Sequence, residues 1–463
     1  MPAARQQARR GASASARHKA AAPARAGGWA GLLFRVGVLF GVVGVAALPV
    51  VAGRIMNDEA VTELFLAPLL IWAGVALLGA WESRRSVFTG DATFVILTLA
   101  LLGLGVTEQL RLGTWAESWQ AWHVYVPLVA GAGGFLGAMR LLSPGMLARG
   151  VTVLRWLLWL AALGVLGALF CFGRRYRGGL FLPGQINPTE LVKLLLVAFS
   201  AAWLPRHAQA LSRTVCGVPL PPLREALQLA VVWGVPLAGV VAVRDLGLLL
   251  ILCLTFVLML AGVTRRAGWL VIGIGAAVAA GWAIRFLSEH TAARFSVWLD
   301  PFADPMGKGW QIGQSLCAQF AGGLWGTGIG EGTPGAVPIV TSDFVYAALA
   351  EEWGLVGCAL LLALYWLWLW RGARGAAAAE SPVCRLMGLG LVSVLGVQIV
   401  LNVGGVTKAL PMTGITLPFF SQGGFSLITV MLMSGLLAAV GRQPSPAENK
   451  GGKEPKRPAA KEG

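Results

Sequence analysis

About twelve long apolar runs divide this 463-residue chain, and they constrain its fold more than any other feature. They lie at roughly 29–52, 65–81, 92–106, 123–139, 152–172, 189–204, 225–243, 246–263, 267–287, 344–370, 384–405 and 421–441. Most approach the roughly 20 residues that a helix needs to cross a bilayer, and they lack the alternation of barrel strands. Since backbone groups in lipid must be satisfied internally, the sequence predicts an all-α polytopic membrane protein with about twelve transmembrane helices. A mean hydropathy of +0.71 and a 56% hydrophobic fraction exceed those of a water-soluble domain.

The lysines and arginines predict the orientation of these helices. With a cytoplasmic N-terminus, twenty-five of the 37 basic residues lie on the cytoplasmic side and ten on the other side, with Arg35 and Lys193 inside helices. Basic loops favour the cytoplasm, so we expect a multi-pass protein of the cytoplasmic membrane with both termini inside. The net charge of +16 reflects this bias and two basic tails, so we expect no nucleic-acid partner.

Composition also predicts how the chain is divided. Residues 1–28 are basic, and residues 442–463 are polar and charged, which predicts disordered cytoplasmic tails. Between them we expect N-terminal spans at 29–149 and a membrane core at 150–441.

A long polar stretch between two apolar runs predicts a site at the membrane surface. This extracytoplasmic loop, about 288–343, carries Arg294, two Asp-Pro turns and the sequence GGLWGTGIG, and a simple connection does not need such length. Gln314 and Ser315 lie on a predicted short helix. Gly322 and Gly323 begin the glycine-rich part, where the backbone either approaches a ligand closely or makes ordinary turns.

Two polar clusters fall on the same predicted face. Asn187, Pro188 and Glu190 have the pattern of a capping box at a helix N-terminus. That pattern leaves Lys193 unexplained, because an unpaired ammonium one turn further into the membrane is costly. We therefore expect Glu190 and Lys193 to form a pair on one helix face. Asp245 suits the N-cap of the helix that follows it, or a functional acid.

Asp343 stands directly before the apolar helix that also carries Glu351 and Glu352. Ser342 or Asp343 suits an N-cap position. A carboxylate at the mouth of a membrane cavity also suits a general base, and the residues alone leave both interpretations open.

Five ordered motifs within residues 150–441 resemble the SEDS family of bacterial cell-envelope glycosyltransferases, which includes RodA, FtsW and SpoVE. The motifs are Asn187-Pro188-Thr189-Glu190…Lys193, Arg244-Asp245-Leu246-Gly247, Arg294 with Asp300 through Ser315, Ser342-Asp343-Phe344…Glu351-Glu352, and Asn402…Leu410 through Ser426. The chain departs from the family pattern at Arg244, where the family has proline. Members typically have three spans before the first motif, whereas this sequence predicts five, so we expect two extra N-terminal spans beside a ten-helix core.

The resemblance implies a peptidoglycan polymerase in cell elongation or division. Such an enzyme joins lipid II disaccharides into a growing glycan strand at the outer face of the cytoplasmic membrane and releases undecaprenyl diphosphate. By motif match, the expected catalytic residues are Asp343 as general base, Glu190 and Lys193. The expected substrate-binding residues are Arg294, Gln314, Ser315, Gly322, Gly323, Asp245, Ser421, Gly423 and Gly424. The family also implies a divalent cation, Mg²⁺ or Mn²⁺, with unknown ligands, and a class B penicillin-binding transpeptidase as partner.

Two other functions stay open at this point. A flippase for lipid-linked sugars would place charged groups along a transmembrane path, whereas the acids here cluster on one predicted face. A non-catalytic scaffold for division or elongation proteins would tolerate replacement of Asp343.

Overall fold

The computed structural model describes residues 29–56, 63–84, 90–113, 122–176, 179–182, 187–215, 218–287 and 289–442, and this part of the chain is almost entirely helical. The long helices are α2 (Trp29–Met56), α3 (Glu63–Glu82), α4 (Ala92–Gly113), α5 (Trp122–Leu141), α6 (Pro144–Phe172), α7 (Thr189–Leu211), α8 (Leu223–Val243), α9 (Leu246–Thr264), α10 (Gly268–Leu287), α13 (Val345–Ala377), α14 (Pro382–Val406) and α15 (Gly424–Val440). Two antiparallel hairpins join helices, β1 (Arg174–Tyr176) with β2 (Gly179–Phe181) and β3 (Thr214–Val215) with β4 (Val218–Pro219).

A helix covers each predicted apolar run, and ten of the described helices are long and apolar enough to cross a membrane. The remaining two apolar runs are covered by α10 and α15. Helix α15 is apolar but shorter than the ten. The all-helical membrane fold is therefore confirmed with ten such helices. The predicted boundary between residues 149 and 150 lies inside α6, which begins at Pro144, ahead of the apolar part of its sequence, so the division of the chain stays a prediction. The predicted tails lie outside the described residues, apart from Arg442.

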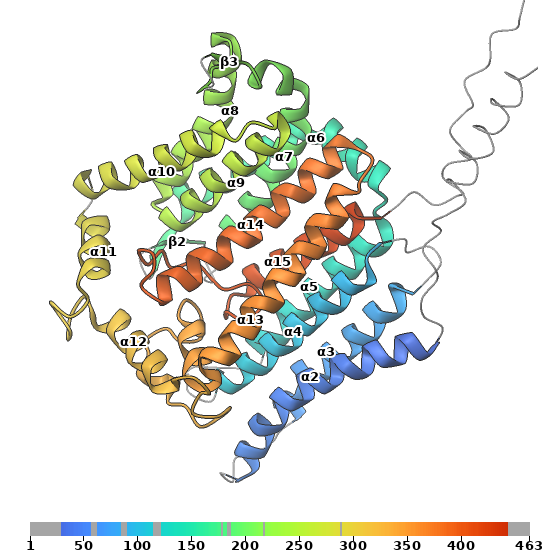
Figure 1. Cartoon of the computed structure of the whole chain (residues 1–463), viewed down its shortest axis with the longest axis vertical. Coiled ribbons are helices and arrows are strands. Elements are labelled where there is room, and N and C mark those ends of the chain that lie inside the picture. Colours follow the sequence, from blue (N-terminus) through green and yellow to red (C-terminus); the bar gives the residue numbers. More distant parts are fainter. Residues whose placement is uncertain are drawn as a thin grey trace, which may run out of the picture.

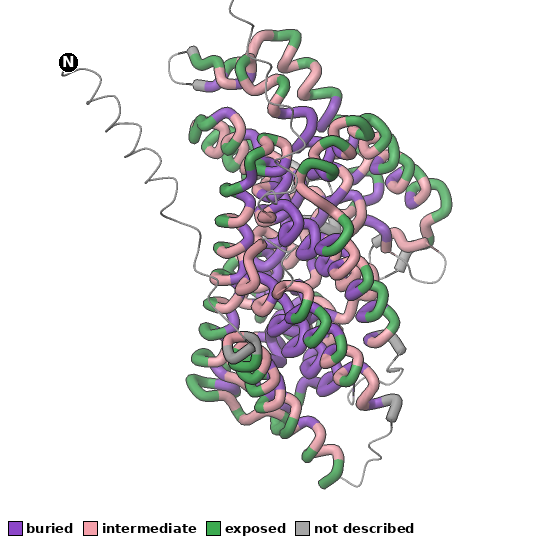
Figure 2. Tube along the Cα trace, turned by 90° about the vertical axis from the view of Figure 1, so that its right-hand side faces the viewer, coloured by how far each residue is buried: buried purple, intermediate pink, exposed green. Residues whose placement is uncertain are grey.

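The helices differ in how deeply they lie in the bundle. Helices α4, α7 and α14 are buried along most of their length, whereas few residues of α6 and α8 are buried. Figure 2 shows the buried residues gathered along the middle of the bundle. Helices α2 and α3 lie at one edge, beside α4 (Figure 1). Trp72 of α3 donates to the carbonyl of Leu99 on α4 at 2.9 Å, and Trp368 of α13 donates to Thr98 Oγ1 on α4 at 2.9 Å. Helix α4 is thus fastened on two sides.

The predicted long loop is a folded segment and not an open connection. It contains α11 (Glu289–Leu299), α12 (Trp310–Gly322) and the 3₁₀ turn η1 (Pro334–Ala336). Helix α12 matches the predicted short helix. The two Asp-Pro turns form as expected: Asp300 Oδ1 accepts from the N–H of Phe302 at 3.1 Å, and Asp304 Oδ2 accepts from the N–H of Lys308 at 3.0 Å. Figure 1 shows α11 and α12 at the periphery of the bundle.

Helix α13 is kinked where the glycine-rich segment packs against it. Gly354 has φ +65° and ψ −172° inside the helix, a conformation that glycine adopts without strain. The N–H of Thr327 donates to the Glu351 carbonyl at 2.9 Å, and the N–H of Leu355 donates to the Gly323 carbonyl at 2.9 Å. The glycine-rich segment therefore satisfies backbone groups that the kink frees.

Candidate active site at one end of the bundle

The first turn of α7 carries a buried ion pair. Lys193 Nζ lies 2.6 Å from Glu190 Oε2, three residues earlier on the helix, so the predicted pair is confirmed. The ammonium also donates to Gln398 Oε1 on α14 at 2.8 Å. The predicted capping box is wrong: the N-cap is Pro188 and no side chain caps the helix. Asn187 Oδ1 accepts from the N–H of Thr189 at 3.1 Å, and Glu190 pairs with Lys193. Two partners compensate the burial of the ammonium.

Asp245 is the N-cap of α9. Its Oδ1 accepts from the N–H of Leu248 at 2.9 Å, so the capping interpretation is confirmed. Burial raises the pKa of Asp245 above its ordinary value, and the Leu248 N–H and the charges of Lys193 and Arg294 oppose that rise. The carboxyl therefore also faces the α7 pair, and an acid so placed is available to a site.

The residue before Asp245 explains a departure from the family pattern. Arg244 ends α8 with φ +62°, in the left-handed region. Proline, whose ring holds φ near −65°, cannot adopt this angle. An arginine is therefore compatible with the left-handed end of α8 in this chain, whereas the family's proline is not.

Arg294 on α11 interacts with the charges of two acids from different segments. Burial lowers the pKa of its guanidinium, and the charges of Asp245 and Asp343 oppose that change. Its Nη1 donates to the Thr413 carbonyl at 3.3 Å and to the Met412 carbonyl at 3.5 Å. Arg294 therefore joins α9, the segment before α13 and the segment between α14 and α15.

Asp343 is half-buried in the turn before α13. The predicted capping role is wrong, because the helix N-cap is Phe344 and no side chain caps it. A Cβ atom on Gly414, whose φ is +73°, would lie 3.4 Å from Asp343 Oδ2. The carboxylate is thus directed toward the Thr413–Gly414 backbone and Arg294, and not to its own helix.

Four hydrogen bonds, three from side chains and one from a backbone N–H, hold the backbone around Asp343. Asn402 Nδ2 donates to the Asp343 carbonyl at 3.0 Å, Ser421 Oγ to the Ser342 carbonyl at 2.5 Å, and Gln109 Nε2 to the Thr341 carbonyl at 3.1 Å. The N–H of Gln422 also donates to the Thr341 carbonyl, at 2.6 Å. The backbone is fixed from α4, α14 and the segment before α15, so the carboxylate has a defined position.

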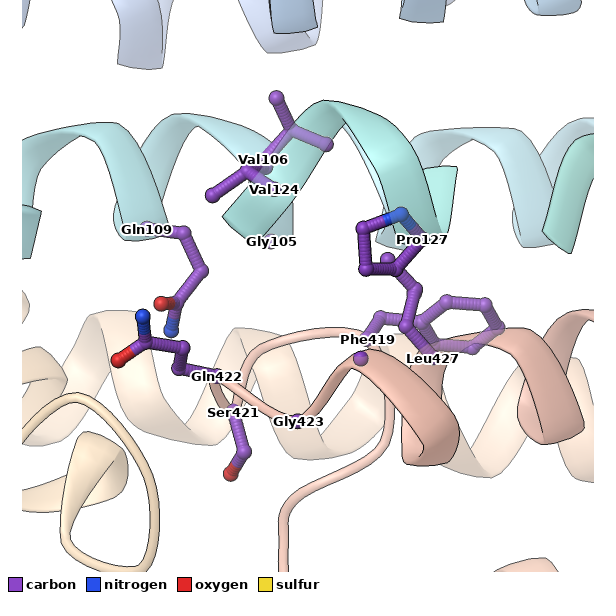
Figure 3. Close-up of a pocket in the computed structure, with 11 residues that line it drawn as sticks. Gly105, Val106, Gln109, Val124, Pro127, Phe419, Ser421, Gln422, Gly423 and Leu427 are labelled. Atoms are coloured by element: carbon purple, nitrogen blue, oxygen red, sulfur yellow. The ribbon is translucent and has the colours of Figure 1, made fainter. Parts of the chain in front are cut away.

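Ser421, Gly423 and Gly424 lie where the chain enters α15. They line a cavity of about 20 Å³ together with Gln109 (Figure 3), which is room for about one water molecule. Ser421 Oγ also accepts from the N–H of Leu417 at 2.7 Å. These contacts give Ser421 a role in holding the turn, and the cavity is too small for a sugar.

Other predicted substrate-binding residues pack into the protein. Ser315 is buried, and its Oγ donates to the Val406 carbonyl at 3.1 Å. Gly322 lies against the Ala350 carbonyl, where a Cβ would clash, and Gly323 has φ +51°. Gln314 is half-buried on α12, and its side chain makes no hydrogen bond to the residues that the structure describes. These contacts give Ser315, Gly322 and Gly323 a packing role, and substrate binding by the four residues stays a prediction.

Sequence reasoning missed a second ionic cluster, which we call the α4 clamp and define as Gln109, Arg111, Glu351 and Glu352. Arg111 Nη2 lies 2.6 Å from Glu352 Oε1 and donates to the Gly330 and Gly332 carbonyls at 3.1 and 3.2 Å. Glu351 Oε1 accepts from the N–H of Thr333 at 2.9 Å. The usable sequence feature was the polar end of α4, TEQLR, which continues an apolar run and is buried.

The charged groups at the candidate site do not fit a resident metal ion. Among the described residues no group of three or more His, Cys, Asp or Glu side chains is arranged so that it could hold a metal ion. The acids that do approach one another face Lys193 and Arg294, which compete with a cation for their oxygens. A protein-held divalent cation would need more free carboxylate or carbonyl oxygens.

Fold and site together define a multi-pass helical membrane protein with a charged site at one end of its bundle. The family model for FtsW, RodA and SpoVE, described as a cell cycle protein, matches residues 151–445. The chain therefore belongs to this bacterial membrane protein family.

Individual relatives agree with that assignment. Peptidoglycan glycosyltransferase RodA of Mycobacterium tuberculosis is 40% identical over 263 residues, 56% of each chain. Stage V sporulation protein E of Bacillus subtilis is 34% identical over 262 residues, 56% of this chain and 69% of that protein. This chain thus spans just over half the length of the RodA relatives that it matches.

Two solved structures resemble the fold. One is a chain of a peptidoglycan synthase complex that coordinates polymerization and crosslinking, with TM-score 0.60, 27% identity and coverage of 76% of this chain and 98% of that chain. The other is the rod shape determining protein RodA of Thermus thermophilus, with TM-score 0.54, 26% identity and coverage of 77% and 98%.

Proposed function

We propose that this protein polymerises peptidoglycan glycan strands from lipid II and releases undecaprenyl diphosphate. Relatives named peptidoglycan glycosyltransferase support the reaction class. The observation that carries the proposal is the electrostatic interaction of Arg294 with Asp245 and Asp343, together with that of Asp245 with the Glu190–Lys193 pair. These groups come from four separate segments, and a packed core needs no such convergence of charge.

Asp343 is the general base of the proposed reaction. The oxygen of the acceptor sugar's 4-hydroxyl bonds to the anomeric carbon of the donor sugar, the bond from that carbon to the diphosphate oxygen breaks, and the hydroxyl proton passes to Asp343. A sugar hydroxyl is a weak nucleophile at neutral pH, so a positioned base contributes roughly 10²- to 10⁴-fold. The hydrogen bonds at the Asp343 and Ser342 carbonyls fit this role, because they fix the base without using its carboxylate.

Arg294 and Lys193 stabilise the charge that develops on the leaving diphosphate. Lys193 is buried and Arg294 is half-buried, and a cation in a water-poor site acts more strongly on developing charge than one in water. Glu190 holds Lys193 in position through the 2.6 Å ion pair. A divalent cation, which the family resemblance implies, would travel with the substrate diphosphate in this scheme, and no step is assigned to it.

The proposal includes a topology of twelve spans with both termini in the cytoplasm. Helices over all twelve apolar runs and the excess of basic residues on one side support it. About a quarter of this chain has no counterpart in the two solved structures, which are themselves covered to 98%. That difference favours two extra N-terminal spans, α2 and α3. A class B penicillin-binding transpeptidase is the proposed partner.

Polymerisation of labelled lipid II tests the reaction. The purified protein, with and without a co-expressed class B transpeptidase, is compared with Asp343→Ala and with Glu331→Ala, which removes an exposed acid from the same segment. Glycan ladders from the wild type and from Glu331→Ala that vanish in a folded Asp343→Ala protein support the polymerase and its base. Ladders that persist in Asp343→Ala exclude this base, and no ladder from any preparation would favour transport or scaffolding.

A further inference from the structure

A second cavity lies near the opposite end of α7 from the candidate site. It has a volume of about 580 Å³, and residues of α6, α7 and α8 line it. Arg206, which lines it, follows Lys193 by 13 positions on the same helix, which corresponds to roughly 20 Å along the axis. The cavity is therefore separate from the candidate site by much of a bilayer's thickness.

Two arginines face this cavity without an acid to balance them. They are Arg155 of α6 and Arg206 of α7. Arg155 Nη1 donates to the Thr152 carbonyl of its own helix at 2.9 Å, and among the described residues neither guanidinium has a carboxylate within ion-pair distance. The nearby acid, Glu225, lies 4.0 Å from His207 Nε2. Two unbalanced guanidinium groups on one cavity are suited to a phosphate.

The remaining walls are apolar and partly open to the surroundings. Trp156, Leu227 and Val231 are 46%, 58% and 57% exposed, and all three line the cavity. Trp203 closes it from the inside, with its ring 3.9 Å from the stacked ring of His207. The cavity thus has a cationic end and an apolar side, which is the complement of an amphiphile.

Both arginines also stand at the edge of the apolar segments. Arg206 comes just after the run that ends near residue 204, and Arg155 comes near the start of the run at 152–172. This is the depth at which lipid phosphates lie, outside the hydrocarbon core. On the proposed topology it is the cytoplasmic leaflet, which is rich in anionic lipids.

We propose that this cavity binds a lipid with an anionic phosphate headgroup. Arg155 and Arg206 hold the phosphate, and the chain lies along Trp156, Leu227 and Val231. Ordinary snorkelling of isolated arginines explains each residue alone. It does not explain why two arginines from different helices share one cavity with no acid between them.

Photocrosslinking in nanodiscs tests this site on the whole protein. The probe is a phosphatidylglycerol with a photoreactive acyl chain, and peptide mapping locates the adducts. We expect adducts on α6 and α8 near Trp156 and Val231. The double variant Arg155→Gln/Arg206→Gln should lower them at least about tenfold, since each lost charge-assisted contact weakens binding by such a factor. The double variant Arg213→Gln/Arg224→Gln is the matched control, because it removes two exposed arginines from the same end of the bundle outside the cavity.

The comparisons decide between a specific site and general lipid contact. Equal labelling by a photoreactive phosphatidylcholine that the Arg155→Gln/Arg206→Gln variant does not change would overturn the proposal. Competition by millimolar inorganic phosphate would assign the cavity to the free ion and overturn the lipid assignment. Competition by undecaprenyl phosphate stronger than by phosphatidylglycerol would keep the site and identify a polyprenyl lipid as its occupant. Matching thermal unfolding of both double variants separates loss of binding from loss of fold.

Discussion

The candidate site and the α4 clamp are both buried groups of charged side chains near the start of α13, but their charged groups interact with different partners. In the clamp, Arg111 pairs with Glu352 and donates hydrogen bonds to the Gly330 and Gly332 carbonyls, and Glu351 accepts a hydrogen bond from the N–H of Thr333. In the candidate site, Lys193 pairs with Glu190. Arg294 interacts with the charges of both Asp245 and Asp343 while it donates to the Met412 and Thr413 carbonyls.

The difference separates a structural network from one that is available for chemistry. A cluster whose charged groups are hydrogen-bonded to backbone carbonyls and amides holds a segment in place, and few of its groups are available to bind a ligand. A cluster of mutually facing acids and cations stores electrostatic energy that a charged substrate can redistribute. The clamp holds the segment at 330–333, and the same segment continues to Asp343, so the two clusters divide support from reaction.

Replacing Asp343 should give the largest effect and only on the reaction. Asp343→Ala is expected to lower lipid II polymerisation by roughly 10²- to 10⁴-fold, while the midpoint of thermal unfolding in detergent stays near that of the wild type. The backbone hydrogen bonds at this position are retained in the variant, which is the reason for unchanged stability. A large loss of stability would instead indicate that Asp343 has a structural role like that of the clamp residues.

Replacing Arg111 should give the reverse result. Arg111→Ala leaves Glu352 buried without its charge partner, and breaking such a pair costs about 3–5 kcal/mol. The side chains of the pair are 6% and 1% exposed, so water does not compensate the loss. Thermal unfolding in detergent measures the effect, and Arg140→Ala is the control, because its pair with Glu82 is largely exposed. An Arg111 variant that unfolds like the wild type but fails to polymerise would erase the distinction between the two clusters.

Sequence patterns predicted the α7 pair and the cap at Asp245 because both depend on residues a few positions apart. The spacing of Glu190 and Lys193 places them on one helix face, and an unpaired lysine in the membrane is costly enough to demand a partner. Likewise, hydropathy located every long helix, since the bilayer imposes length and composition on each span.

Long-range contacts were not predictable in the same way. Gln109 and Arg111 follow the apolar run at 92–106 in the sequence, yet their partners are more than 200 residues away in the chain. The glycines at 322 and 323 suited a ligand loop from their composition alone, while their use against the α13 kink depends on Gly354 adopting φ +65°. Local pattern cannot encode which distant backbone a glycine approaches.

A third prediction concerns Asp245, the member of the candidate site that also caps a helix. Its pKa is raised in the folded state, so between its ordinary value and the raised value the folded protein binds more protons than the unfolded protein. Stability therefore falls as pH rises through that range. Asn caps a helix as well as Asp, so Asp245→Asn should lose this slope and gain in unfolding midpoint relative to the wild type toward higher pH. The gain should be smaller than the loss in Arg111→Ala, and parallel pH profiles would contradict it.

The smallest effect is expected at the other end of the same helix pair, where α4 and α13 meet again through charge. Arg371 Nε lies 2.7 Å from Asp91 Oδ2, and its Nη2 donates to Asp91 Oδ1 at 2.7 Å. The geometry is as close as in the clamp, but the two side chains are 27% and 25% exposed. Partly hydrated pairs contribute about 0–1 kcal/mol, so Arg371→Gln should shift the unfolding midpoint little and leave polymerisation unchanged. If Arg371→Gln destabilises the protein as much as Arg111→Ala, then α4–α13 docking in general, and not the burial of the clamp, accounts for the cost.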